Sequence, residues 1–182
     1  MRQDANEIKA FLQARNITTL CHFTDERNLS YILKFGLLSR QKLAQKGYKH
    51  YYNDEMRLDG AMDFISLSIT NINHFLADCF IRQGKIQSCV VLELDANLLW
   101  RQFSRRLYCQ TNAATAGCKK GDRVSDFAAL FDDEVSYKNR TCVRQNLNLN
   151  ANETTDSQAE ILWAGWVKPE FIKGHYVYQP NF

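Results

Sequence analysis

The run at residues 88–94, Ser-Cys-Val-Val-Leu-Glu-Leu, places the strongest constraint on how this chain can fold. A short and nearly continuous apolar run is typical of a strand inside a sheet, where both faces are covered. We therefore predict that this run is a central strand and that the other elements of the 182-residue chain pack around it.

Shorter patterns predict alternating helices and strands. We expect strands at 17–23, 64–69, 159–163 and 175–178, and helices at 4–15, 24–36, 74–81, 97–100 and 123–131. Cap residues support the helix starts and Gly36 supports the end of the second helix. Mixed helices and short strands favour an α+β fold over a doubly wound sheet.

The chain shows no sign of division, because its two prolines, Pro169 and Pro180, mark no linker and there are no repeats. We expect one domain over residues 1–182. No Gly-x-Gly-x-x-Gly or Gly-Lys-Ser/Thr motif follows a strand, which disfavours Rossmann and P-loop nucleotide sites.

Three polar segments interrupt this pattern. Residues 42–60 are rich in lysine and tyrosine, and we expect an ordered functional loop or a short helix over a cleft. Residues 101–122 are basic and are predicted to be irregular. Residues 132–156 are polar and long, which is typical of either a functional loop or partial disorder.

Composition narrows the class of protein. The net charge of +3 is too small to indicate a polyanionic partner by itself. The six cysteines have no Cys-x-x-Cys spacing, which disfavours a zinc site. The start of the chain is polar and no apolar run approaches ~20 residues, so we expect a cytoplasmic protein with free thiols and no membrane span, rather than a disulfide-stapled secreted domain.

The clearest candidate for chemistry is residues 157–163, Ser-Gln-Ala-Glu-Ile-Leu-Trp, where a polar run turns into an apolar one. We expect a loop that leads into a strand, with Gln158 and Glu160 on one face. A carboxylate there suits a cationic transition state. The alternative is an exposed glutamate on an edge strand.

Two other spots have equally plain alternatives. His22, at the end of a strand, is either a ligand-binding residue or a histidine satisfied by the backbone. Arg57 lies in the motif at residues 53–60, Asn-Asp-Glu-Met-Arg-Leu-Asp-Gly, and could bind a ligand or simply pair with Asp54 or Asp59. Ser66 and Ser68 follow on the strand at 64–69.

Five motifs in series resemble one family. They are His-Phe-Thr from residue 22 with the later Ile-Leu-x-x-Gly-Leu-Leu, the motif at 53–60, Ile-Ser-Leu-Ser-Ile, Thr-Asn-Ala-Ala from residue 111, and Gln-Ala-Glu-Ile-Leu. Together, from about residue 20 to residue 172, they resemble the DarT family of bacterial toxins, which ADP-ribosylate nucleic-acid bases. The motif at 53–60 is more similar to the guanine-modifying branch than to the thymine branch.

The resemblance implies a split, mixed or antiparallel β-sheet flanked by helices, with NAD⁺ as the ADP-ribose donor and no metal. It implies that Glu160 and Arg57 are catalytic, with Glu160 stabilising positive charge on the ribose. It also implies a larger set of residues that bind NAD⁺, namely His22, Thr24, Asn28, Gly36, Leu37, Tyr48, Tyr52, Arg57, Ser66 and Ser68, with Tyr51 a further candidate for stacking on nicotinamide.

The basic segment at residues 101–123 also indicates a nucleic-acid substrate. Basic residues of 101–123 lie among aromatic ones, and such segments bind unpaired strands. The candidate acceptor-binding residues are Gln158, Asn112, Arg105, Arg106, Lys119 and Lys120. We expect a single-stranded DNA substrate and an antitoxin partner. The alternatives are an RNA substrate, a protein substrate, a binding protein without activity, and a basic segment that is only a solvated surface.

Overall fold

The structure, a computed structural model, describes residues 2–51, 60–137 and 140–180. Its helices are α1 (Arg2–Ala14), α2 (Leu29–Phe35), α3 (Arg40–Gln45), α4 (His74–Arg82), α5 (Leu98–Arg101), α6 (Val124–Ala128) and α7 (Arg144–Leu147), with 3-10 turns η1 (Glu26–Asn28), η2 (Ala129–Phe131) and η3 (Pro169–Phe171). Its strands are β1 (Thr19–Asp25), β2 (Leu37–Leu38), β3 (Phe64–Ile69), β4 (Cys89–Asp95), β5 (Arg106–Cys109), β6 (Lys120–Gly121), β7 (Glu134–Tyr137), β8 (Arg140–Val143), β9 (Glu160–Ala164), β10 (Trp166–Val167) and β11 (Ile172–Val177).

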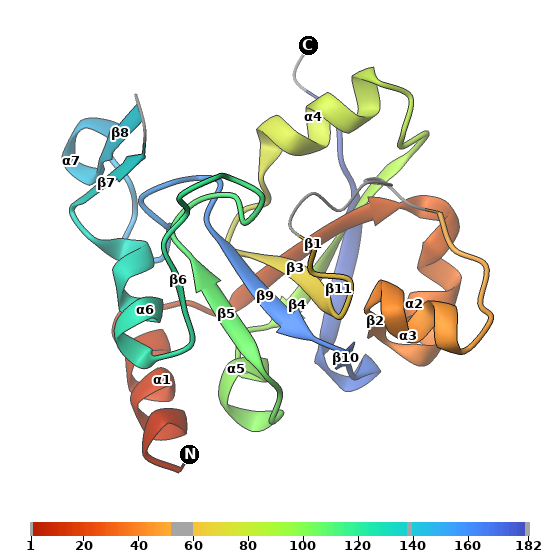
Figure 1. The fold of residues 1–182 in the computed structure, drawn as a ribbon, viewed down its shortest axis with the longest axis horizontal. Coiled ribbons are helices and arrows are strands. Elements are labelled where there is room, and N and C mark those ends of the chain that lie inside the picture. Colours follow the sequence, from red (N-terminus) through yellow and green to blue (C-terminus); the bar gives the residue numbers. More distant parts are fainter. Residues whose placement is uncertain (1, 52–59, 138–139, 181–182) are drawn as a thin grey trace.

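Seven strands form one sheet in the order β11-β4-β1-β3-β9-β5-β6, and each pair of neighbours is antiparallel (Figure 1). The predicted strand at 88–94 is β4, which lies inside the sheet but second from its edge. Its side chains are shared between two cores. Leu92 and Leu94 belong to the larger one, and Cys89 and Val91 belong to the smaller one. This double coverage explains the continuous apolar run.

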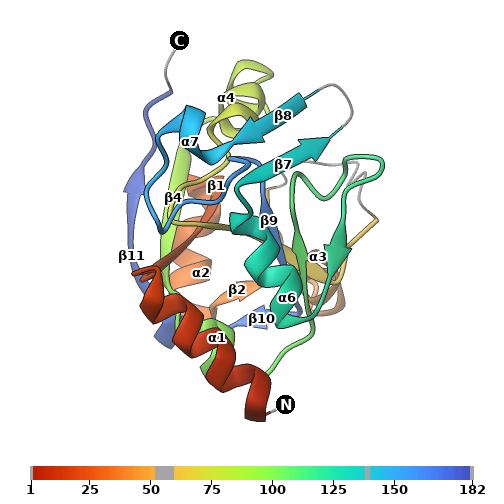
Figure 2. The ribbon, with the colours of Figure 1, turned by 90° about the vertical axis from the view of Figure 1, so that its left-hand side faces the viewer.

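The helices cover the two faces unequally. Helices α1 and α6 lie together on one face, where the Phe11 and Phe127 ring centroids are 5.1 Å apart (Figure 2). They enclose the larger core together with Trp163 of β9. Helix α4 covers the other face through Ala77 and Phe80. The predicted α+β class, a sheet flanked by helices, is therefore correct.

Several predicted boundaries were wrong. The strand predicted at 17–23 extends to Asp25, so Thr24 lies within β1 and does not cap a helix. The Asp25 side chain accepts a hydrogen bond from the Arg27 backbone and caps η1 instead. The segment 101–122 is not irregular, because it contains β5 and β6. Its alternating Arg-Leu-Tyr-Cys sequence at 106–109 pairs with β9.

The long polar segment at 132–156 also has regular structure. Strands β7 and β8 pair as a hairpin, from Glu134 with Val143 to Tyr137 with Arg140, and α7 follows directly. Figure 1 shows this unit next to the end of the sheet where β9 begins. Thr154, Thr155 and Asp156 are buried there, since their polar groups are paired with other parts of the protein.

Candidate functional site

A cleft opens where the sheet divides. Strands β1 and β3 pair at Leu20 with Ile69 and at Cys21 with Ser68, and then diverge. Beyond these pairs, His22 Nδ1 lies 2.8 Å from the Ser66 carbonyl oxygen and bridges the gap. The adjoining pocket contains about 730 Å³ of empty space, which includes its mouth open to solvent.

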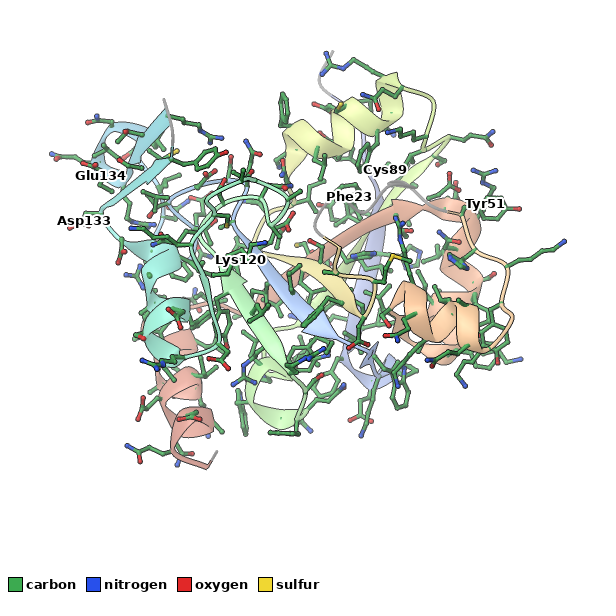
Figure 3. The ribbon with its side chains drawn as sticks, viewed as in Figure 1. Phe23, Tyr51, Cys89, Lys120, Asp133 and Glu134 are labelled. Carbon is green, nitrogen blue, oxygen red and sulfur yellow. The ribbon has the colours of Figure 1, made fainter. Side chains whose placement is uncertain are left out.

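Asn28 fixes the outer wall of this cleft. Its amide nitrogen donates to the Thr24 hydroxyl at 3.0 Å and to the Tyr51 carbonyl at 2.9 Å, and its amide oxygen accepts from the Tyr51 backbone at 2.9 Å. One side chain therefore connects the end of β1 with a chain segment that is 23 residues away. Figure 3 shows Tyr51 beside this end of β1.

An ion pair between the buried Asp25 and the exposed Arg27 supports the same wall. Asp25 is 1% exposed and accepts two hydrogen bonds from the Arg27 guanidinium, at 2.7 and 2.9 Å. Burial alone would raise the pKa of Asp25, but the hydrogen bonds from Arg27 and from the backbone of Gln87 keep this pKa below its usual value. The Arg27 guanidinium also lies 3.8 Å from the Tyr51 ring centroid, which extends the support to Tyr51.

The cleft gathers most of the residues predicted to bind NAD⁺. Those that line it are His22, Thr24, Asn28, Gly36, Leu37 and Ser66. Tyr51 lines it as well, whereas Tyr48 lines a neighbouring hollow and packs on Tyr31, with their ring centroids 4.7 Å apart. Ser68 is buried at the point where β1 and β3 pair and does not line the cleft. Tyr52 and Arg57 lie outside the described residues.

Gly36 makes the floor of the cleft possible. Its backbone, with φ 83° and ψ 176°, lies in a region that is open almost only to glycine. A Cβ atom at this position would lie 2.3 Å from the Val167 carbonyl oxygen and 2.5 Å from the Trp166 indole nitrogen. Glycine therefore lets α2 approach β10 closely and lets Leu37 pair with Val167.

Glu160 is the first residue of β9 and is 6% exposed. Its carboxylate accepts hydrogen bonds from the Asn112 amide nitrogen and from the Ala113 backbone nitrogen, each at 3.2 Å. Leu162 pairs with Ser66 of the cleft wall, and Glu160 precedes Leu162 by two residues on the same face of β9. The glutamate is therefore a buried carboxylate on an inner strand, next to β3 but not among the residues that line the cleft, and the alternative of an exposed edge residue is excluded.

Gln158 lies in a turn before β9, so strand alternation does not determine where its side chain points. The turn is held by Asp156, whose Oδ1 accepts from the Gln158 backbone nitrogen at 2.9 Å. The same oxygen accepts from Arg140 of β8 at 3.0 Å. The sequence motif identified this segment, but the contact with a residue 16 positions away had no signal in the sequence.

The basic residues predicted to bind the acceptor are spread along β5 and β6 and are not all close to Glu160. Lys120 donates to the Ala113 carbonyl, near Glu160. Arg106 instead pairs with Trp163 and donates to the Leu99 carbonyl at 2.8 Å, near the far end of β5. Arg106 and Cys109, at the two ends of β5, are three positions apart, which corresponds to roughly 10 Å along an extended strand. Figure 3 shows Lys120 on the opposite side of β3 from Tyr51.

The remaining predicted residues follow this division. Arg105 binds Asp63 at 2.9 Å and lies 4.8 Å from the Phe64 ring centroid, on the Arg106 side. Lys119 is exposed, and its carbonyl accepts a hydrogen bond from the Gln110 backbone on the Lys120 side. Of the predicted acceptor-binding residues, Asn112 therefore contacts Glu160, Lys119 and Lys120 lie at the same end of β5, and Arg105 and Arg106 lie at its other end.

The loop between β5 and β6 contains a thiol pair that the spacing rules did not identify. A hydrogen bond between Cys109 and Cys118 raises the pKa of Cys109, and burial raises it further. The same bond lowers the pKa of Cys118 against the effect of burial, with help from backbone hydrogen bonds and the charge of Lys120. Because Cys109 pairs with Glu160 across the strands, this thiol pair adjoins the candidate catalytic carboxylate.

Within residues 2–51, 60–137 and 140–180, no group of three or more His, Cys, Asp or Glu side chains is arranged to hold a metal ion. Among the same residues, no helix has the length and apolar character needed to cross a membrane.

Comparisons with known proteins agree on one family. A family model described as ssDNA thymidine ADP-ribosyltransferase, DarT, matches residues 21–181. No curated protein matches the sequence.

Solved structures resemble the fold at low sequence identity. The structure of Thermus sp. 2.9 DarT with ADP-ribosylated ssDNA has a TM-score of 0.60 at 17% identity, covering 90% of this chain and 83% of that one. The complex of Thermus sp. 2.9 DarT with NAD⁺ has a TM-score of 0.57 at 16% identity, covering 89% and 82%. Thermosipho africanus DarTG with ADP-ribose has a TM-score of 0.59 at 16% identity, covering 89% of this chain but only 44% of that one.

Proposed function

Because the chain belongs to the DarT family, we propose that it transfers ADP-ribose from NAD⁺ to a base in single-stranded DNA. The observation that carries this proposal is the fixed carboxylate of Glu160, which is buried and held by Asn112 and Ala113 beside the cleft between β1 and β3. The solved structures of DarT with NAD⁺ and with ADP-ribosylated ssDNA support the same reading.

In this proposal NAD⁺ binds in the cleft, where His22, Thr24 and Asn28 contact the adenosine end. Cleavage of the bond between nicotinamide and ribose leaves positive charge on the ribose, and the Glu160 carboxylate stabilises that charge. The hydrogen bonds from Asn112 and Ala113 hold the Glu160 carboxylate in position before the reaction starts. The Arg57 guanidinium acts as a second catalytic group that holds a phosphate or the acceptor.

The acceptor strand lies on the other side of Glu160. Gln158 orients the base, and Lys119 and Lys120 hold the backbone phosphates near the reacting centre. Arg105 and Arg106 contact the strand further along, because the length of β5 separates them from Lys120. A single strand suits this arrangement, since a base inside a duplex must first be unstacked and unpaired.

We further propose guanine as the acceptor, on the similarity of the motif at 53–60 to the guanine-modifying branch. The description of the matching family model names thymidine, so thymidine is the alternative acceptor. We also propose that the protein acts in the cytoplasm as a toxin that a partner antitoxin restrains. Thermosipho africanus DarTG is the relative that suggests such a pairing, and this chain covers less than half of it.

The test is mass spectrometry of DNA and RNA oligonucleotides after incubation with the protein and NAD⁺. We expect an ADP-ribose adduct on guanine-containing single-stranded DNA, and a loss of at least about 100-fold in rate for Glu160→Gln, because the amide cannot stabilise the ribose cation. Glu134→Gln is the matched control, since Glu134 is an exposed residue on the β7–β8 hairpin. Near wild-type activity of Glu160→Gln contradicts the role of Glu160, and adducts on thymidine or RNA alone contradict the proposed acceptor.

A further inference from the structure

The segment that leads into β9 is held in place from outside the sheet. Asp156 is 2% exposed, and its Oδ1 is shared by two donors, the Gln158 backbone nitrogen at 2.9 Å and the Arg140 guanidinium at 3.0 Å. The Asp156 carbonyl accepts two more hydrogen bonds, from the Thr154 hydroxyl and from the Ala159 backbone, each at 2.9 Å. All of these bonds meet at Asp156, which lies four residues before Glu160.

Arg140 is the only long-range partner among these donors. It belongs to β8 and is 44% exposed, whereas the carboxylate that it binds is almost completely buried. A buried carboxylate without a cation is unfavourable, so this contact ties the turn to the β7–β8 hairpin. A second arginine, Arg144, donates to the carbonyls of Glu153 and Asn150 and to the Thr155 hydroxyl, and so holds the preceding residues.

We infer that Arg140 and Asp156 are positioning residues for the acceptor step. The hydrogen bond from Gln158 to Asp156 is an Asx-turn, in which an aspartate side chain binds the backbone two residues ahead and sets its direction. Arg140 holds that aspartate in place. The pair thereby determines where the Gln158 side chain points relative to Glu160, and hence how the acceptor base meets the ribose. This inference rests on the proposed function for its chemical meaning.

The inference gives the β7–β8 hairpin a specific task. Glu160 itself is held by Asn112 and Ala113, which belong to the loop between β5 and β6 and not to the hairpin. Loss of the Arg140 contact should therefore disturb the acceptor side while leaving the carboxylate near the donor cleft. Transfer to DNA needs both parts, whereas hydrolysis of NAD⁺ by water needs only the second.

The experiment compares two reactions in one set of variants, Arg140→Gln, Arg140→Lys and Asp156→Asn. For Arg140→Gln and Asp156→Asn we expect transfer to DNA to fall about tenfold, because a small misplacement of reacting groups is costly, while NAD⁺ hydrolysis changes less than about twofold. Arg140→Lys keeps the charge and should recover part of the transfer rate. Arg82→Gln, on the exposed side of α4, is the matched control.

Amide hydrogen exchange is the second measurement, and it does not depend on activity. We expect faster exchange at Gln158 and Ala159 in Arg140→Gln and unchanged exchange there in Arg82→Gln. A proportional fall of both reactions, or unchanged exchange at these two amides, overturns the positioning role. If the wild-type protein labels no nucleic acid, the proposed function fails, and hydrogen exchange still decides whether Arg140 orders this turn.

Discussion

The two sides of the candidate site are built from different kinds of contact. On the donor side, most of the lining of the cleft comes from residues 22–51, and a single side chain, Asn28, links the two ends of this stretch. On the acceptor side, Glu160 and the turn before it depend on partners 16 to 48 residues away, namely Arg140 and Asn112. The donor side is thus built mostly from one continuous stretch of the chain, which reaches β3 through the His22–Ser66 contact and β10 through the close approach at Gly36. The acceptor side is instead assembled from three separate segments, which contain Asn112, Arg140 and residues 156–160.

The two sides should therefore respond differently to substitutions. The wall formed by residues 22–51 depends on backbone geometry and on one or two side chains, so a single substitution that causes a steric overlap should disrupt it. An assembly of remote segments has several supports, so the loss of one should change alignment more than stability.

Gly36→Ala should cause the largest loss. Alanine is strained at φ 83° and ψ 176°, and its Cβ would overlap the Val167 carbonyl oxygen, which is backbone and cannot move cheaply. We expect the free energy of unfolding to fall by about 3 kcal/mol from strain and overlap combined. Denaturant unfolding of the purified protein measures this change.

Gly47→Ala is the matched control, because Gly47 also has a positive φ, 67°, but nothing lies within 4 Å of its Cβ position. We expect a loss of about 1 kcal/mol from the left-handed backbone alone. Equal losses for the two variants would mean that the close approach of α2 and β10 does not support the cleft.

This contrast also explains what could be predicted from the sequence. Residues near each other in the chain carry their own signals, so the motif around His22 and the glycine at 36 identified most of the donor wall. The site at Glu160 was predicted from the change from a polar to an apolar run. Asp156 carried no signal for its role, because a buried aspartate is recognisable only when its partner, Arg140, is known to lie beside it.

The incorrect prediction for residues 101–122 also arose because long-range pairing determines their structure. Residues 101–122 were predicted to be irregular because β5 and β6 are short, four and two residues, and their pairing with β9 is a long-range property. The basic residues there were grouped by closeness in the sequence. An extended strand instead places Arg106 and Lys120 at opposite ends of β5, a separation that closeness in the sequence does not show.

Asn28→Ala should weaken NAD⁺ binding without unfolding the protein. The variant removes all three hydrogen bonds that hold Tyr51 and Thr24, each worth about 1 kcal/mol. If the ordered wall is then present in about a tenth of the molecules, the Kd for NAD⁺ rises about tenfold. Titration calorimetry measures the Kd.

Asn112→Ala tests the acceptor side separately, since Asn112 supports Glu160 rather than the cleft wall. We expect its Kd for NAD⁺ to stay within about twofold of wild type while transfer slows, because the loss affects only the transition state. A rise in Kd that is as large for Asn112→Ala as for Asn28→Ala would show that the two sides are not separate.

The smallest expected effect concerns Cys118, in the loop that carries Asn112. The hydrogen bond from Cys109 lowers the pKa of Cys118, and only the thiolate reacts with an alkylating agent. The thiolate is present above the pKa, so we expect alkylation of Cys118 to begin at a lower pH than for a free cysteine. In Cys109→Ala the main cause is gone, and the pH profile should move upward. Mass spectrometry of alkylated peptides across a pH series measures both profiles.

The modified protein then tests the acceptor side directly. Cys118 and Ala113 pack with Cys109 in one small cluster, and Ala113 donates to Glu160, so a bulky adduct on Cys118 should disturb the loop that holds the carboxylate. We expect slower transfer with an unchanged Kd for NAD⁺, and full protection in Cys118→Ser. An adduct that weakens NAD⁺ binding as much as it slows transfer would contradict a division of labour between the two sides, because the loop between β5 and β6 contributes no residue to the lining of the cleft.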